Sequence, residues 1–219
     1  MNPEVITSYI PLFAQAFVLT VKIGWTGIAL AFLIGVLCAF ILYFRVPVAS
    51  AAVRCYVELF RNTPLLVQLF FIYYGLPAVG IRISAEVCGA VGLGLLGGSY
   101  MTESIRSGLE AIPVIQNESA RSLGMTNSQL FKNVILPQAF TISVPGILAN
   151  VIFLLKETSV FSAISLMDLM FTAKDLIGLY YDTIESLALL VIFYVIMLLP
   201  VSLAGSFIEK KVRFKMFGD

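Results

Sequence analysis

The chain has 219 residues, of which 59% are hydrophobic and only 12% are charged, against about 45–50% apolar and about 25% charged in an average soluble domain. This composition excludes an ordinary soluble enzyme and a disordered chain, and the near balance of 14 basic and 13 acidic residues argues against a nucleic-acid-binding surface. Since the chain contains no histidine, a His-based catalytic triad is excluded and no metal site is expected.

Charge-free windows of about 20 residues mark the expected membrane-spanning helices, because a hydrocarbon core of about 30 Å accommodates that many helical residues. Five windows follow one another: Ile23–Phe44, Asn62–Ile81, Val87–Thr102, Asn133–Leu155 and Ser186–Ile208. The third is short, but Ser84 can cap its start, and the helix can continue toward Gly108 if its polar groups face protein. We expect an all-α integral membrane protein with about five transmembrane helices, in which residues 1–219 form a single transmembrane domain.

The distribution of basic residues predicts the orientation of these spans. With the N-terminus outside and the C-terminus inside, the cytoplasmic side receives the basic tail at residues 210–215. The outer loops then keep only Arg82 and Lys174. The other basic residues expected on the cytoplasmic side are Arg45, Arg54, Arg106, Arg121 and Lys132.

The longest connection on the predicted cytoplasmic side, about residues 110–137, does not have the composition of a linker. Its apolar and polar residues alternate as in two short amphipathic helices. Gly124 marks the end of the first helix, residues 126–129 form a capping-box pattern for the second, and Pro137 is expected to close it. Such a helix pair indicates a docking surface; the alternative is an amphipathic hairpin lying on lipid.

The glycine-rich run at residues 92–97 matches G-x-G-x-x-G, the pattern of dinucleotide-binding folds. It lies inside a predicted span and follows no strand, so we interpret it as a small-residue face with Gly94 and Gly98 in G-x-x-x-G spacing. The chain has no G-x-x-x-x-G-K-[ST] phosphate-binding loop. If ATP is used, another chain must bind it.

The connection at residues 110–137 carries Glu118-Ser119-Ala120, then Gly124, then Val134-Ile135-Leu136-Pro137. This resembles the EAA loop of ABC importer permeases, whose pattern is E-A-A, three residues, G, nine residues and I-x-L-P. Only Ser119 and Val134 depart from it. The resemblance implies a type I ABC importer permease fold, in which these residues form coupling helices that dock on a cytoplasmic ATPase. The coupling residues so implied are Glu118, Ala120, Gly124, Leu136 and Pro137.

Three further segments resemble signatures of the polar amino-acid uptake permeases, which serve His, Gln, Arg, Glu and related substrates. They are Glu58–Leu69, Tyr100–Gly108 and Leu155–Val160. Two departures stand out: the third signature more often reads K-D-T-S than Lys156-Glu157-Thr158-Ser159, and R-G-T-P is more usual than Arg61-Asn62-Thr63-Pro64.

The resemblance implies a non-enzymatic transport subunit in the bacterial cytoplasmic membrane. It binds no cofactor itself, since ATP and Mg belong to the partner ATPase. The other implied partners are a second permease subunit, identical or similar, and an extracytoplasmic solute-binding protein. Neither the particular amino acid nor the identity of the second permease follows from the sequence.

Ionisable groups in a membrane segment are costly and often mark a transport pathway. Lys156 and Glu157 follow an apolar run and project about 100° apart on a helix, so each needs its own partner. Together with the hydroxyls of Thr158 and Ser159 they match the groups of a zwitterionic amino acid. The alternative is that both charges snorkel to the outer surface.

Three more residues are placed on the substrate pathway: Thr63, Gln68 and Glu103. Glu103 has a structural alternative, because it can pair with Arg106, which can also meet Glu110. A direct pair between Glu103 and Lys156 is disfavoured by their different depths. Charged groups in apolar surroundings also leave a rival function open, an ion-coupled secondary transporter or channel that works without ATP.

Overall fold

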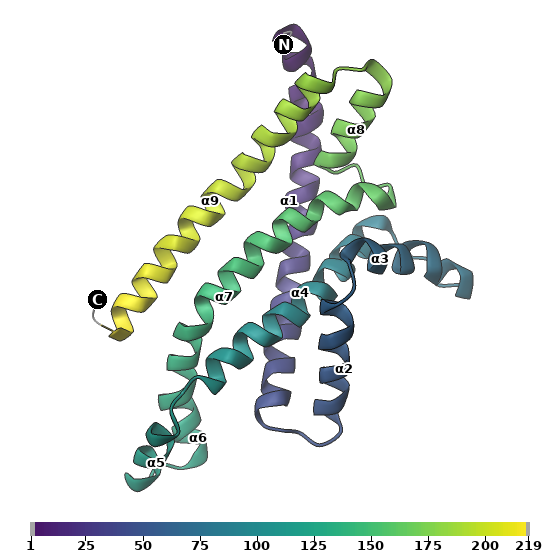
Figure 1. The fold of residues 1–219 in the computed structure, drawn as a ribbon. Coiled ribbons are helices and arrows are strands. Elements are labelled where there is room, and N and C mark those ends of the chain that lie inside the picture. The colour runs from purple at the N-terminus through teal and green to yellow at the C-terminus, as the bar shows by residue number, and fades with distance from the viewer. Residues whose placement is uncertain (1–2, 218–219) are drawn as a thin grey trace.

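The computed structural model describes residues 3–217, apart from the side chains of residues 213 and 215–217. The side chains of Arg213 and Lys215, in the predicted cytoplasmic tail, therefore lie outside the described residues. Within that range the chain contains helices and no strand, as predicted (Figure 1). The α-helices are α1 (Pro3–Tyr43), α2 (Ala49–Arg61), α3 (Leu65–Phe70), α4 (Ala85–Glu110), α5 (Val114–Ser122), α6 (Asn127–Leu130), α7 (Leu136–Glu157), α8 (Leu169–Tyr180) and α9 (Thr183–Phe217).

Length and apolarity qualify three described helices as membrane spans, Pro3–Tyr43, Asn127–Ile164 and Thr183–Val212. The bent pair α2 and residues 65–79 is a fourth candidate. α4 is not among these candidates, but its 26 residues are about 39 Å long at 1.5 Å each, sufficient to cross the hydrocarbon core. Half of them are buried, among them the polar residues Ser99 and Thr102.

The first helix begins 20 residues earlier than predicted, at Pro3 instead of Ile23. The prediction starts the span after Lys22 because a charge is costly in a membrane. In the structure Lys22 Nζ lies 3.0 Å from Glu86 Oε2 of α4, and both side chains remain about half exposed or more. A cation with a surface partner does not end a helix, and α1 continues through it.

The second predicted span, Asn62–Ile81, is shorter in the structure: helix covers only residues 65–79 of it, and it qualifies as a span only together with α2. α2 ends at Arg61, and the chain turns by 106° before residues 65–79 continue as helix. Pro64 explains the break, because it lacks an N–H donor and disfavours helical geometry at Thr63. Gln68 Nε2 stabilises the turn by donating to the carbonyl oxygens of Phe60 and Thr63 and to the Thr63 hydroxyl, at 2.9–3.0 Å.

The remaining helices largely follow the predicted windows. Ser84 caps α4, accepting from the Val87 N–H at 3.4 Å. α7 runs without interruption through Pro145. α8, between α7 and α9, was not expected; Asp168 caps it by accepting from the N–H groups of Met170 and Phe171.

α1 and α4 pack closely through glycines, which confirms the predicted small-residue face. A Cβ atom added at Gly94 would lie 2.5 Å from Leu30 Cδ2, and one at Gly98 would lie 2.7 Å from Ile34 Cγ2. α1 contributes a matching glycine, because a Cβ atom at Gly27 would lie 2.9 Å from Leu93. The backbones therefore approach more closely than larger residues allow. We call this glycine-lined contact the α1–α4 seam. The main buried core forms around it, with α3 and α7 packed against it.

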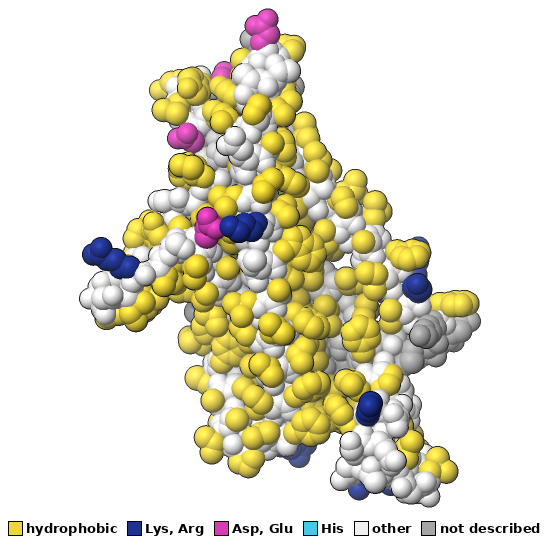
Figure 2. Space-filling view, turned by 180° about the vertical axis from the view of Figure 1, so that it is seen from behind, with side chains coloured by type: hydrophobic (Ala, Val, Ile, Leu, Met, Phe, Trp, Pro, Cys, Tyr) yellow, Lys and Arg dark blue, Asp and Glu magenta, His cyan; other side chains and the backbone are white. Residues whose placement is uncertain are grey.

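α9 begins beside the start of α1 at the top of Figure 1 and runs downward, so its far end lies well away from the start of α1. α5, α6 and the connection between α1 and α2 share one end, which we call the coupling end (Figure 1). Figure 2 shows a largely hydrophobic rear face, on which acidic side chains appear only in the upper half and most basic ones in the lower half. This distribution agrees with the charge bias behind the predicted orientation.

Candidate functional site: coupling segment and polar cavities

Residues 110–137, which we call the coupling segment, form two short helices joined by a tight turn. Gly124 has φ +78°, in the left-handed region that favours glycine. Its N–H donates to Arg121 O at 2.9 Å, and the Met125 N–H donates to Ala120 O at 3.2 Å. These two bonds form a Schellman motif that ends α5, so the predicted role of Gly124 in the turn is confirmed.

The second helix starts as predicted and ends differently. Thr126 and Gln129 form a capping box at the start of α6. Pro137 does not close this helix, contrary to the prediction, because α6 continues through a π-helical turn at residues 131–135 into α7. A π turn widens the helix directly before Pro137, where the ring would otherwise clash with the carbonyl four residues earlier. The second helix of the coupling segment is thus a continuous extension of a membrane helix.

The coupling segment has a buried face and an exposed apolar face. Ala120 is buried in a small core with Leu109 and Leu130. Glu118, Leu136 and Pro137 are exposed. Apolar side chains on the outer side are also strongly exposed: Val114 68%, Ile115 63% and Leu123 82%. A group of this kind on the end of a bundle is characteristic of a protein-binding surface.

At the opposite end of α7, the structure separates the four residues predicted to form one pocket. Glu157 lines one cavity, whereas Lys156 and Ser159 line another, between α7 and α9. Thr158 is fully buried, and its hydroxyl donates to Leu155 O at 2.7 Å. Lys156 and Glu157 therefore point to different surfaces, as their adjacent positions on a helix require.

The cavity that contains Glu157, about 400 Å³ in volume, lies between α2, α3, α4 and α7. We call it the Glu157 cavity. Thr63 also lines it, together with Arg61 and Tyr100. The Arg61 guanidinium lies 5.3 Å from the centre of the Tyr100 ring, a cation–π arrangement. The cavity thus offers a carboxylate, a guanidinium, a hydroxyl and an aromatic ring.

Sequence reasoning did not select Arg61 and Tyr100, although both lie within segments that carry the family resemblance. Gln68 is buried, and its amide nitrogen is occupied by the α2–α3 turn, so the residue positions Thr63. Its Oε1 atom is buried without a hydrogen-bond partner. Gln68 therefore shapes the wall of the Glu157 cavity.

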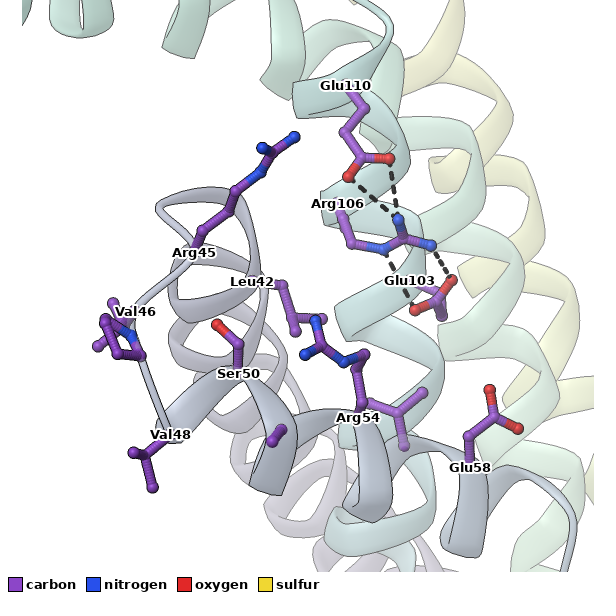
Figure 3. Close-up of a pocket in the computed structure, with 13 residues that line it drawn as sticks. Leu42, Arg45, Val46, Val48, Ser50, Arg54, Glu58, Glu103, Arg106 and Glu110 are labelled. Carbon is purple, nitrogen blue, oxygen red and sulfur yellow. Dashed lines mark hydrogen bonds and ion pairs between the residues drawn. The ribbon is translucent and has the colours of Figure 1, made fainter.

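Glu103 belongs to a row of charges along α4 (Figure 3). Arg106 Nη2 lies 2.7 Å from Glu103 Oε2, and Arg106 Nη1 lies 2.9 Å from Glu110 Oε2. Arg61 of α2 approaches Glu103 at 3.7 Å. The structural alternative considered for Glu103 is therefore present, and no ion pair joins it to Lys156 among the described residues. Through Arg61, this row also contacts the Glu157 cavity.

The sequence matches known transport proteins over nearly its whole length. Residues 31–216 match the family described as "Binding-protein-dependent transport system inner membrane component". The chain is 28% identical over 213 residues to the probable glutamine ABC transporter permease protein GlnM of Bacillus subtilis, covering 97% of this chain and 99% of that protein. It is 31% identical to the arginine transport system permease protein ArtQ of the same organism, covering 93% and 94% of the two chains.

Solved structures share the fold. A chain from the crystal structure of an amino acid ABC transporter with histidines has a TM-score of 0.90 and 32% identity, covering 96% of this chain and 99% of that one. A chain of the MetNI methionine ABC transporter in an inward-facing conformation has a TM-score of 0.79 at 21% identity. The predicted type I ABC importer permease fold is thereby confirmed. The chain belongs to the family of binding-protein-dependent transport system inner membrane components, as a multi-pass permease subunit.

Proposed function

We propose that this chain is the transmembrane subunit of an ATP-driven importer that moves a polar amino acid across the bacterial cytoplasmic membrane. Full-length similarity to permeases named for glutamine and arginine supports the substrate class. The coupling segment supports the link to a separate ATPase. The similarity to ABC transporter permeases and the exposed coupling segment occur in one chain. An ion-coupled transporter or channel needs neither, so together they favour the importer.

The observation that carries the proposal is the exposed surface of the coupling segment. Glu118 is exposed on α5 and Gly124 lies at the turn, and Val114, Ile115 and Leu123 present apolar area to the outside. Burial of such area contributes about 25 cal/mol per Å², so an ATPase groove that covers it gains affinity. Because the segment continues into α7, movement of a docked ATPase is transmitted to the helix that carries Glu157.

For the substrate pathway we propose the Glu157 cavity. A zwitterionic amino acid carries an ammonium group, which suits Glu157, and a carboxylate, which suits Arg61. Thr63 offers a hydroxyl, and Tyr100 a flat apolar face. Lys156 and Ser159 border the neighbouring cavity and remain candidates for a later position on the path. Glu103 then acts through its contact with Arg61.

The proposal implies three partners. A second permease subunit completes the pathway, and a pair of cytoplasmic ATPases binds ATP and Mg and grips both coupling segments. An extracytoplasmic solute-binding protein delivers the amino acid. Closure of the ATPase pair then moves the two permeases together and alternates access between the two sides.

Reconstitution tests the function directly. The chain is co-expressed with its ATPase, purified as a complex, and placed in liposomes with the binding protein outside. We expect uptake of one labelled amino acid that requires internal ATP, and competition by the twenty amino acids identifies the substrate class. Uptake that persists without nucleotide, or a chain that never retains an ATPase, contradicts the proposal and favours ion-coupled transport.

A further inference from the structure

A second polar cavity, separate from the Glu157 cavity, lies at the coupling end of the molecule. It has a volume of about 540 Å³ and lies between α2, α4 and the turn that joins α1 to α2 (Figure 3). We call it the hairpin cavity. Its size falls within the range of about 300–1,000 Å³ typical of small-molecule sites. Its charged lining residues are Arg45, Arg54, Glu58, Glu103, Arg106 and Glu110.

The hairpin cavity is lined by three basic and three acidic side chains, but not all of them form ion pairs within the described chain. Arg106 is engaged on both sides by Glu103 and Glu110. Arg45 and Arg54 have no ion pair or hydrogen-bond partner for their side chains among the described residues. Among the described residues, the Glu58 carboxylate accepts a single hydrogen bond, from the Asn62 side-chain amide at 3.1 Å. The cavity therefore presents unpaired guanidinium groups on one part of its wall and an available carboxylate on another.

The charge pattern of α2 complements that of α4. Along α2 the order is Arg54, Glu58, Arg61, and along α4 it is Glu103, Arg106, Glu110. A single ion pair joins the two rows in the described part of the chain, Arg61 with Glu103 at 3.7 Å. Arg54 and Glu58 of α2 form no ion pair across the hairpin cavity among the described residues, so both charges are available to a ligand that carries both signs.

The turn that forms the outer wall is held in an unusual backbone conformation. Arg45 has φ +52° and Val48 has φ +64°, both in the left-handed region that is costly for such side chains. The Ser50 hydroxyl helps to fix the turn by donating to Ile41 O at 3.1 Å. In this conformation the Arg45 side chain extends toward α4 (Figure 3).

We propose that the hairpin cavity is a second binding site, for a compact ligand that carries an ammonium group next to an oxyanion, and that this ligand is a free α-amino acid. Arg45 and Arg54 bind the carboxylate, and Glu58 binds the ammonium group. The equal number of basic and acidic residues disfavours a polyanion such as a nucleotide. The inference rests on the proposed function, because the amino acid at the coupling end is the transported one after translocation.

The two cavities are distinguished by binding to the purified permease–ATPase complex without nucleotide. The probes are tritiated L-glutamine, L-arginine and L-histidine, each measured alone, with the N-acetyl derivative as the form that lacks the ammonium group. We expect two classes of site for at least one probe and binding of the N-acetyl form to neither. Arg54→Gln and Glu58→Gln each weaken binding at the same class of site, the hairpin cavity, by at least tenfold, because a charge-assisted hydrogen bond is lost.

Matched variants separate this effect from general damage. Arg82→Gln, which removes an exposed cation outside the cavity, leaves both classes unchanged. Glu157→Gln weakens the other class only. Arg54→Lys restores part of the lost affinity because it restores the charge. Each variant is first shown to elute as a single species with its ATPase bound.

Three results overturn the inference: a single class of site that Arg54→Gln leaves intact, equal binding of the N-acetyl form, or occupancy of the cavity by phosphatidylethanolamine in place of the amino acid. The last result is measured as the amount of phosphatidylethanolamine that co-purifies with wild type and with Arg54→Gln. Failure of the proposed function looks different, because ATP-dependent uptake is then absent in the wild-type complex whatever the hairpin cavity binds.

Discussion

The α1–α4 seam and the coupling segment are built on opposite principles. In the seam, glycines on both helices allow backbones to approach so closely that an added Cβ atom would overlap a neighbour. In the coupling segment, Gly124 has open space around it and is needed only for its backbone conformation. A glycine in the seam therefore supports packing, whereas Gly124 supports the shape of an exposed turn.

This difference predicts that damage to the two regions has different consequences. The seam lies in the main buried core, so a change there affects every helix that packs on it. The coupling segment rests on a small separate core, and its outer face contacts no other part of the described chain. We expect seam variants to lose the fold and coupling variants to lose only the partner.

The largest effect is expected at Gly97. A Cβ atom there would lie 2.5 Å from Leu154 Cδ1 and 2.7 Å from Ala31 Cβ. Gly97→Leu forces these helices apart, and overpacking of this kind costs about 1–3 kcal/mol or more. The measurement is the yield of monodisperse protein in detergent and its apparent thermal midpoint. Gly178→Leu in α8 is the control, since nothing lies within 4 Å of Gly178. Equal yields of the two variants contradict the packing argument.

The second prediction concerns the coupling segment and compares two turn glycines. Gly124→Asp places a negative charge on the docking surface, so we expect the permease to insert normally while ATPase association and uptake fall at least tenfold. Gly80→Asp is the matched control, because Gly80 has φ +85° and equally open surroundings outside the coupling segment. Gly124→Asn, which tolerates this conformation without a charge, should retain most of the association. Normal uptake by Gly124→Asp contradicts the assignment of the docking surface.

A third, smaller effect is expected in the Glu157 cavity. Glu157→Gln removes one charge-assisted hydrogen bond worth about 1.5–3 kcal/mol, which raises the half-saturation concentration roughly ten- to more than a hundredfold. Glu157→Asp keeps the charge on a shorter arm and should retain transport with altered preference among amino acids. Glu86→Gln, which breaks only the exposed pair with Lys22, should change uptake little. Unchanged half-saturation in Glu157→Gln means that Glu157 is a surface anchor.

Local signals in the sequence predicted the coupling segment well. Gly124, the Thr126 capping box and the Ser84 cap each act through residues within four positions, so spacing alone identifies them. The Gly94 and Gly98 face was also predictable, because G-x-x-x-G spacing places both glycines on one side of α4. The failure at Pro137 has a local cause too, since a π turn absorbs the proline and no spacing rule announces it.

The candidate site was less predictable because it depends on which helices meet. The separation of Lys156 from Glu157 follows from their helical positions, but the identity of the two cavities depends on the packing of α9 and on the bend at Pro64. Arg61 joins Tyr100 and Glu103 only because α2 ends beside α4. The charge-free windows in the sequence placed Arg61 just before the second predicted span. They gave no reason to connect Arg61 with Glu157.

The smallest expected effect is a difference in the pH dependence of stability between two helix caps, Thr126 in the coupling segment and Asp168 in the bundle. The cap at Thr126 is exposed and uncharged, whereas Asp168 is fully buried, and burial raises its pKa from 3.8 to about 6 against the opposing hydrogen bonds from Phe171 and Met170. Between these two values the folded protein binds a proton that the unfolded chain does not. Stability therefore rises as the pH falls through about 6 toward 4.

Comparison of wild type with Asp168→Asn isolates this contribution, because the asparagine keeps an acceptor for the cap and does not titrate. We expect the apparent thermal midpoint of wild type to rise by a few degrees relative to Asp168→Asn as the pH is lowered from 7 to 4. Thr126→Ala should instead lower stability by about 1 kcal/mol at every pH in this range. A difference between wild type and Asp168→Asn that stays constant, or changes in the opposite direction, means that the hydrogen bonds to the carboxylate outweigh its burial. The buried cap would then be stabilised in its charged form.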